Sequence, residues 1–169
     1  MKTSASCGRQ SSPLWTARLC LALVPLLLGS ASGVAAQAVT LEGVWGVTIT
    51  PRNCTTNEPL PLPPHRTILT FHRDGTTTES VGVLTFAPGQ RAIGHGIWAH
   101  AGGQIFNERT VAMILFDAGI YRAGWQVISR TITMTDANNY TGFGPSQFFD
   151  ANRQMYLAGC ASSVGVRFQ

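Results

Sequence analysis

The sequence predicts an all-β protein, an eight-stranded antiparallel up-and-down β-barrel. Segments rich in β-branched and aromatic residues recur along the chain, and Gly, Pro, Asn and Asp separate them at short intervals. No segment beyond the first 36 residues has a helical period of useful length. A meander of eight strands has two unpaired edges, and closing the sheet into a barrel removes both. We therefore expect one barrel domain over residues 37–169.

The first 36 residues have the pattern of a secretory signal peptide. Basic residues precede a short apolar run, Leu19–Leu28, and the small residues Val34–Ala36 follow as a cleavage site. The apolar run is shorter than the roughly 20 residues that a membrane-spanning helix needs. We therefore expect residues 1–36 to be cleaved, and the mature chain to be secreted or periplasmic with no membrane anchor.

The mature chain, 133 of the 169 residues, is almost neutral. It holds nine arginines and eight acidic residues, a formal charge of +1, because Lys2 is the only lysine of the sequence. Nucleic-acid binding calls for a basic patch, and electrostatic attachment to acidic membranes calls for a basic cluster. The charge balance therefore argues against both partners.

The first strand is expected over Leu41–Thr50. A proline-rich connection, Asn53–Pro64, separates it from the second strand, Arg66–Arg73. Asp74-Gly75 is a two-residue hairpin signal, and it leads into the third strand, Thr76–Phe86.

Five more strands follow, with Gly, Pro, Asp and Asn at the turns between them. They are expected over Ala92–His100, Ile105–Phe116, Tyr121–Met134, Tyr140–Asp150 and Gln154–Ala161, with a short tail at Gly165–Phe168. An eight-stranded barrel has an interior wide enough for side chains and one small ligand.

Two cysteines, Cys54 and Cys160, remain in the mature chain. In an oxidising compartment, an even pair is expected to form one disulfide. Such a bridge closes a loop of about 100 residues, which is worth on the order of 4.7 kcal/mol in the chain-entropy model.

Gly43-Val44-Trp45, on the first expected strand, resembles the Gly-x-Trp motif of the lipocalins and the wider calycin superfamily. In that superfamily the tryptophan closes one end of the barrel and packs against an arginine near the C-terminus. Arg167 stands in the corresponding place, where its guanidinium can stack on the indole. The resemblance implies a calycin-like barrel, with Trp45 and Arg167 in structural roles.

The register of a closed meander provides a check on this interpretation. The first and last strands of such a barrel pair antiparallel, so paired residues have a constant index sum. Trp45 with Arg167 gives 212, and Cys54 with Cys160 gives 214. The two pairs therefore agree to within about two residues of register.

Three residues are candidates for acid–base chemistry. Gly94-His95-Gly96 is an unusual string in which glycines permit close approach of a ligand to His95. The alternative is a bent strand with His95 hydrogen-bonded to a neighbour. Glu79 and Glu108 lie mid-strand, where an inward carboxyl would have a raised pKa. The alternative for each is a solvent-facing carboxylate or a pair with arginine.

Four aromatic residues are candidates for ligand contacts in a cavity, with a filled core as the alternative: Trp98, Phe106, Tyr121 and Trp125. No metal site or cofactor is expected, because the histidines lack ligand spacing and both mature cysteines are committed to the bridge. The sequence also has no nucleophile elbow and no phosphate-binding glycine loop.

These observations favour a secreted lipocalin-like barrel that binds a small hydrophobic molecule in its interior. One alternative is a cofactor-free enzyme of the cyclase or isomerase type, similar to the allene oxide cyclase barrels, acting on an apolar substrate. Such an enzyme orients a reactive substrate beside one acid or base. The other alternative is an exported structural protein with a filled barrel.

Overall fold

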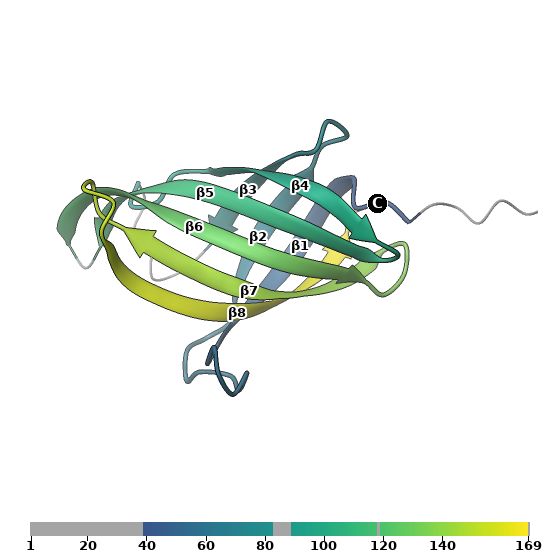
Figure 1. Cartoon of the computed structure of the whole chain (residues 1–169), viewed down its shortest axis with the longest axis horizontal. Helices are drawn as coiled ribbons and strands as arrows, with labels where there is room; N and C mark the ends of the chain where they lie inside the picture. The colour runs from purple at the N-terminus through teal and green to yellow at the C-terminus, as the bar shows by residue number, and fades with distance from the viewer. Residues whose placement is uncertain (1–38, 83–88, 118, 169) are drawn as a thin grey trace, which may run out of the picture. The chain divides into compact units, whose positions relative to one another are not determined.

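The structure, a computed structural model, describes residues 39–82, 89–117 and 119–168. The predicted signal peptide and the end of the predicted third strand lie outside these residues. Figure 1 shows the described chain wound into a barrel of strands. Across these ranges the chain forms no helix at all, and so none that could cross a membrane.

Every strand pairs antiparallel with its sequence neighbour, and β8 pairs back onto β1, which closes the barrel. The prediction of an all-β, eight-stranded up-and-down barrel is confirmed. The strands are β1 (Gly43–Arg52), β2 (His65–Phe71), β3 (Thr76–Gly82), β4 (Gly94–Gly102), β5 (Ile105–Asp117), β6 (Ile120–Met134), β7 (Asn139–Phe149) and β8 (Met155–Arg167).

The end of the chain differs from the sequence-based expectation. The predicted eighth strand and the predicted tail form one continuous strand, β8. Its residues pair with β7 from Met155 to Val166 and with β1 from Cys160 to Arg167. Because both neighbours extend past Ala161, the ladder continues through the serines where the sequence suggested a break.

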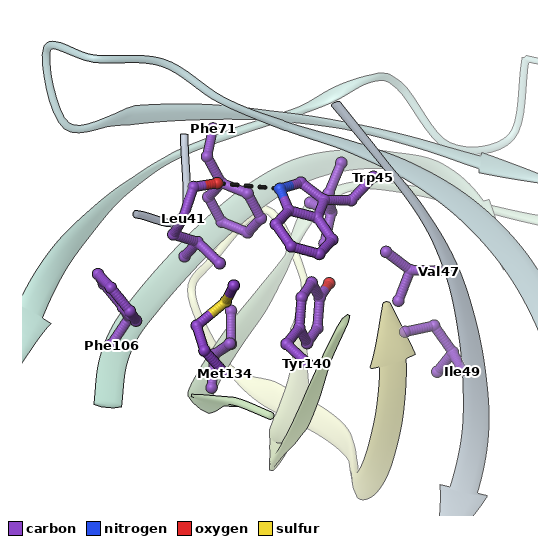
Figure 2. Close-up of a cluster of buried hydrophobic side chains, with 10 residues drawn as sticks. Leu41, Trp45, Val47, Ile49, Phe71, Phe106, Met134 and Tyr140 are labelled. Atoms are coloured by element: carbon purple, nitrogen blue, oxygen red, sulfur yellow. Dashed lines mark hydrogen bonds between the residues drawn. The ribbon is translucent and has the colours of Figure 1, made fainter. Parts of the chain in front are cut away.

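One end of the barrel is filled by a hydrophobic core (Figure 2). Trp45 and Tyr140 are fully buried, with ring centres 4.9 Å apart. Leu41, just before β1, closes this end and accepts a hydrogen bond from Trp45 Nε1 at 2.9 Å. Phe71 and Met134 complete the packing from the ends of β2 and β6.

Arg167 forms hydrogen bonds that link neighbouring chain segments at this closed end of the barrel. Its Nε donates to the Ala137 carbonyl at 3.0 Å, Nη2 donates to the Thr40 carbonyl at 2.6 Å, and Nη1 donates to the Glu42 carbonyl. It also pairs with Trp45 across β1 and β8, at the index sum that the sequence suggested.

At the opposite end, the disulfide Cys54–Cys160 ties the proline-rich connection to β8, with the two Cα atoms 5.1 Å apart. The predicted bridge is confirmed. Asn53 orders the connection: its Oδ1 accepts hydrogen bonds from the backbone N–H groups of Thr55 and Thr56. Arg52 adds a second tie, donating to Ser162 Oγ at 2.7 Å and to the Asn57 carbonyl at 2.9 Å.

Candidate functional site

A cavity of about 860 Å³ occupies the end of the barrel away from the Trp45 core. Its residues come from the ends of strands that meet there: Pro51 at the end of β1, His65 at the start of β2 and Phe148 at the end of β7. Leu60 and Leu62 of the proline-rich connection also contribute to its wall. The volume lies within the roughly 300–1,000 Å³ typical of small-molecule sites.

The cavity has room because β7 and β8 turn small residues inward, and its wall is mainly apolar. Gly144 and Ser146 on β7 lie beside Ala161 and Gly159 on β8. These short side chains leave the space that bulky residues fill at the closed end. The larger apolar residues of the wall are Ile49, Leu60, Leu62, Ile128, Phe148 and Leu157.

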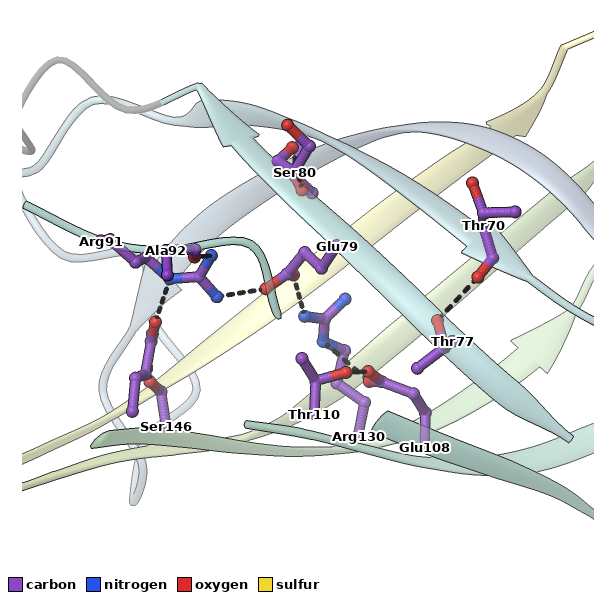
Figure 3. A network of polar contacts seen from close by, with 12 residues as sticks. Thr70, Thr77, Glu79, Ser80, Arg91, Ala92, Glu108, Thr110, Arg130 and Ser146 are labelled. Carbon is purple, nitrogen blue, oxygen red and sulfur yellow. Dashed lines mark hydrogen bonds and ion pairs between the residues drawn. The ribbon is translucent and has the colours of Figure 1, made fainter. Parts of the chain in front are cut away.

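The inner end of the cavity carries a buried ionic cluster (Figure 3). Glu79 on β3 lies between two guanidinium groups. It accepts from Arg130 Nη2 at 2.6 Å and from Arg91 Nη2 at 2.5 Å. The three side chains are 1%, 5% and 4% exposed, respectively. Each of these three residues lines the cavity.

The short segment before β4 positions Arg91. Its backbone follows β5, with an isolated bridge from Arg91 to Ile114 and a hydrogen bond from the Ala92 N–H to the Met113 carbonyl at 3.0 Å. Arg91 Nε then donates to Gln126 Oε1 at 2.6 Å. Arg91 is therefore held in place from both β3 and β6.

Glu108 on β5 approaches the cluster from the other side. Its Oε2 lies 3.4 Å from Arg130 Nε, and its Oε1 accepts a hydrogen bond from Thr110 Oγ1. The side chain is fully buried, but Glu108 is not among the residues that line the cavity. Arg130 thus lies between two carboxyl groups and makes its closer contact with Glu79.

The two glutamates have opposite pKa shifts. Burial raises the pKa of Glu108, and the more distant Arg130 offsets this only in part. Burial acts in the same direction on Glu79, but the charges of Arg130 and Arg91 outweigh it and lower the pKa of Glu79. Glu79 therefore carries the stable negative charge of the cluster.

The Gly-His-Gly string has a steric explanation. His95 is exposed on β4, whereas Gly94 and Gly96 face the interior opposite Thr110. A Cβ on Gly94 would lie 2.7 Å from Thr110 Cγ2 and 3.3 Å from Glu79 Cβ. The glycines make room for the ionic cluster, and His95 lies outside it.

The four predicted ligand-contact aromatics lie away from the cavity. Phe106 is buried in the closed-end core, and Trp98 packs against it with ring centres 5.8 Å apart. Tyr121 and Trp125 are 66% and 36% exposed. Of the three acid–base candidates, the structure brings together Glu79 and Glu108.

Sequence reasoning missed several residues of the site. Arg91 falls between the predicted third and fourth strands, and Arg130 lies within the predicted sixth strand with no candidate role. Ser163 lies in the gap between the predicted last strand and the tail. His65 falls between the proline-rich connection and the predicted second strand, but it begins β2 and lines the cavity. Burial lowers the pKa of His65.

Nothing in the described ranges points to a resident metal ion, since no three His, Cys, Asp or Glu side chains come together there. A scan against protein-family models finds no matching family, and a search of curated proteins finds no match. The case for a function therefore rests on the cavity and the cluster.

Proposed function

We propose that this protein is an exported, lipocalin-like binding protein that holds a small hydrophobic molecule in the open half of its barrel. The observation that carries the proposal is the cavity of about 860 Å³ with its apolar wall. An apolar cavity with a few convergent polar groups is the common form of a ligand site. The disulfide supports export, because such bridges persist in oxidising compartments.

The geometry favours binding over catalysis. Glu79 is the carboxylate at the cavity, but two guanidinium groups hold it ionised and lower its pKa. A general base is most effective with a pKa near the working pH. His95 is exposed, and its place on β4 is outside the cavity lining. The alternative of a filled barrel fits only the half of the interior around Trp45, because the other half contains the cavity.

Gly159 offers a direct test. It lines the cavity, and a Cβ built on it would meet no atom within 4 Å. Gly159→Phe should therefore place a ring in the cavity without a clash at its Cβ, and Gly159→Ala is the matched control. We expect the neutral fluorescent probe N-phenyl-1-naphthylamine to bind the wild-type and Gly159→Ala proteins, and to bind Gly159→Phe at least about tenfold more weakly. Equal binding by all three proteins would refute the cavity as the site.

A further inference from the structure

Two polar side chains at the inner end of the cavity have hydrogen-bonding atoms without partners. Among the described residues, neither Arg130 Nη1 nor Ser163 Oγ has a hydrogen-bond partner. The Arg130 side chain is 5% exposed and Ser163 is 2% exposed. Both residues line the cavity. Buried polar groups are rarely left unsatisfied in native proteins, so each such group calls for an explanation.

The strands that carry Arg130 and Ser163 lie on either side of β7, which has glycines at the facing positions. Ile128 pairs with Ser146 and Thr131 with Phe143, so the same register sets Arg130 opposite Gly144 on β7. On the other side of β7, Gly142 pairs with Ser163 of β8. The inward positions of β7 between the two side chains are therefore glycines, and a Cβ on Gly142 would collide with Ser163 Oγ.

The cluster is formally neutral, and its guanidinium nitrogen without a partner among the described residues favours a hydrogen-bond acceptor on the ligand. Arg91 and Arg130 are opposed by Glu79 and Glu108. Burial raises the pKa of Glu108, which weakens its ability to balance Arg130. Arg91 is fully engaged, because its three nitrogens donate to Glu79, Gln126 and the Ala92 carbonyl. The unused donor of the cluster therefore belongs to Arg130.

We propose that the ligand is an amphiphile with a carboxylate head, whose oxygens accept hydrogen bonds from Arg130 Nη1 and Ser163 Oγ. Its hydrocarbon chain then lies along Ile49 and Ile128 toward Phe148 and Leu157 at the mouth. This inference rests on the proposed function and adds the chemical class of the ligand. A guanidinium recognises a carboxylate with charge-assisted hydrogen bonds, which are about twice as strong as neutral ones.

Isothermal titration calorimetry at pH 7.5 tests this with three probes of one chain length, the two ionic probes below their micelle concentrations and the alcohol below its solubility limit. The probes are decanoate, 1-decanol and decyltrimethylammonium, added to the protein purified with its disulfide intact. We expect decanoate to bind about tenfold or more tightly than 1-decanol, because only decanoate places a charged acceptor at Arg130. The cation should bind most weakly.

Variants of the protein separate recognition of the ligand's carboxylate head from burial of its hydrocarbon chain. Ser163→Ala should weaken decanoate binding about three- to tenfold and weaken 1-decanol binding less, because the alcohol forms only a neutral hydrogen bond there. Arg130→Lys keeps a positive charge between the glutamates but removes the free Nη1 donor, and it should erase the preference for decanoate. Ser129→Ala, on the opposite face of β6, is the matched control and should bind both probes like the wild type.

The outcomes distinguish this inference from the proposed function. Equal affinity for decanoate and 1-decanol, or tightest binding of the cation, overturns the carboxylate inference and leaves the hydrophobic site standing. Binding of none of the three probes overturns the proposed function as well. A decanoate preference that persists in both Arg130→Lys and Ser163→Ala places the head elsewhere and also overturns the inference.

Discussion

The guanidinium of Arg167 on β8 lies 4.2 Å from the centre of the Trp45 indole ring on β1. This contact joins the two strands that close the barrel, at the end where the core is filled. The same arginine donates to three backbone carbonyls. The closed half is thus fixed by one aromatic core and one arginine, and the open half is free to hold a ligand.

Replacing Arg167 should destabilise the barrel. Arg167→Ala removes a cation–π contact worth about 0.5–2 kcal/mol and three hydrogen bonds worth about 0.5–1.5 kcal/mol each. We expect the free energy of unfolding in urea to fall by about 2–4 kcal/mol. Arg109→Ala, an exposed arginine on β5, is the control and should change it by less than about 0.5 kcal/mol. Equal effects of the two variants would contradict the role assigned to Arg167.

Any side chain at Gly43 should lower the stability of the barrel. It has φ +125°, a conformation that disfavours other residues, and a Cβ there would lie 2.6 Å from Arg167 Nη1. Gly43→Ala should lower the free energy of unfolding by about 1–3 kcal/mol, by backbone strain and by displacing Arg167. Gly159→Ala, with open space at its Cβ, is the matched comparison in the same thermal melt. If Gly43→Ala were as stable as Gly159→Ala, the close approach of Gly43 to Arg167 would contribute nothing to stability.

The positive φ of Gly43 and the close approach of Arg167 therefore explain the glycine of the Gly-x-Trp motif. The sequence predicted the barrel and its closing register, because alternation, turn residues and the two index sums all constrain one topology. It did not predict which residues line the cavity, because a one-residue slip reverses the face of every side chain in a strand. On β6 the ligand-contact candidates Tyr121 and Trp125 are 66% and 36% exposed, whereas Arg130 is buried in the interior.

Glu79 and Glu108 should affect stability in opposite directions as pH changes. The pKa of Glu79 is held below its ordinary value of 4.5. Its contribution to stability is therefore present above pH 4.5 and is lost as the pH falls through the lowered value. Glu79→Gln should cost about 3–5 kcal/mol at pH 7, because it removes the charge that Arg91 and Arg130 share. The cost should shrink below pH 4.5, as measured by urea unfolding at pH 3, 4, 5.5 and 7.

Glu108→Gln provides the opposite profile. The pKa of Glu108 is raised above 4.5, so its contribution to stability is present below pH 4.5 and is lost as the pH rises through the raised value. The stability of Glu108→Gln relative to the wild type should therefore improve from pH 4 to pH 7. Parallel profiles for the Glu79 and Glu108 variants would contradict the assignment of the stable charge to Glu79.

The disulfide should support both stability and the shape of the cavity mouth. Cys54→Ser combined with Cys160→Ser removes a cross-link over a sequence separation of 106 residues. The expected loss is about 2–5 kcal/mol in the free energy of unfolding. Because the bridge ties the connection that bears Leu60 and Leu62, probe binding should also weaken. An unchanged affinity in the folded double variant would show that the connection keeps its place without the bridge.

The most direct test of the central claim, that the open half of the barrel holds the ligand, is an NMR titration of isoleucine methyl groups with decanoate. Ile49 and Ile128 line the cavity, whereas Ile68 and Ile97 are 48% and 64% exposed on the outer surface. We predict saturable shifts of the Ile49 and Ile128 methyl signals, with Ile68 and Ile97 unchanged. Shifts confined to the outer isoleucines, or no shift at saturating decanoate, would contradict the account.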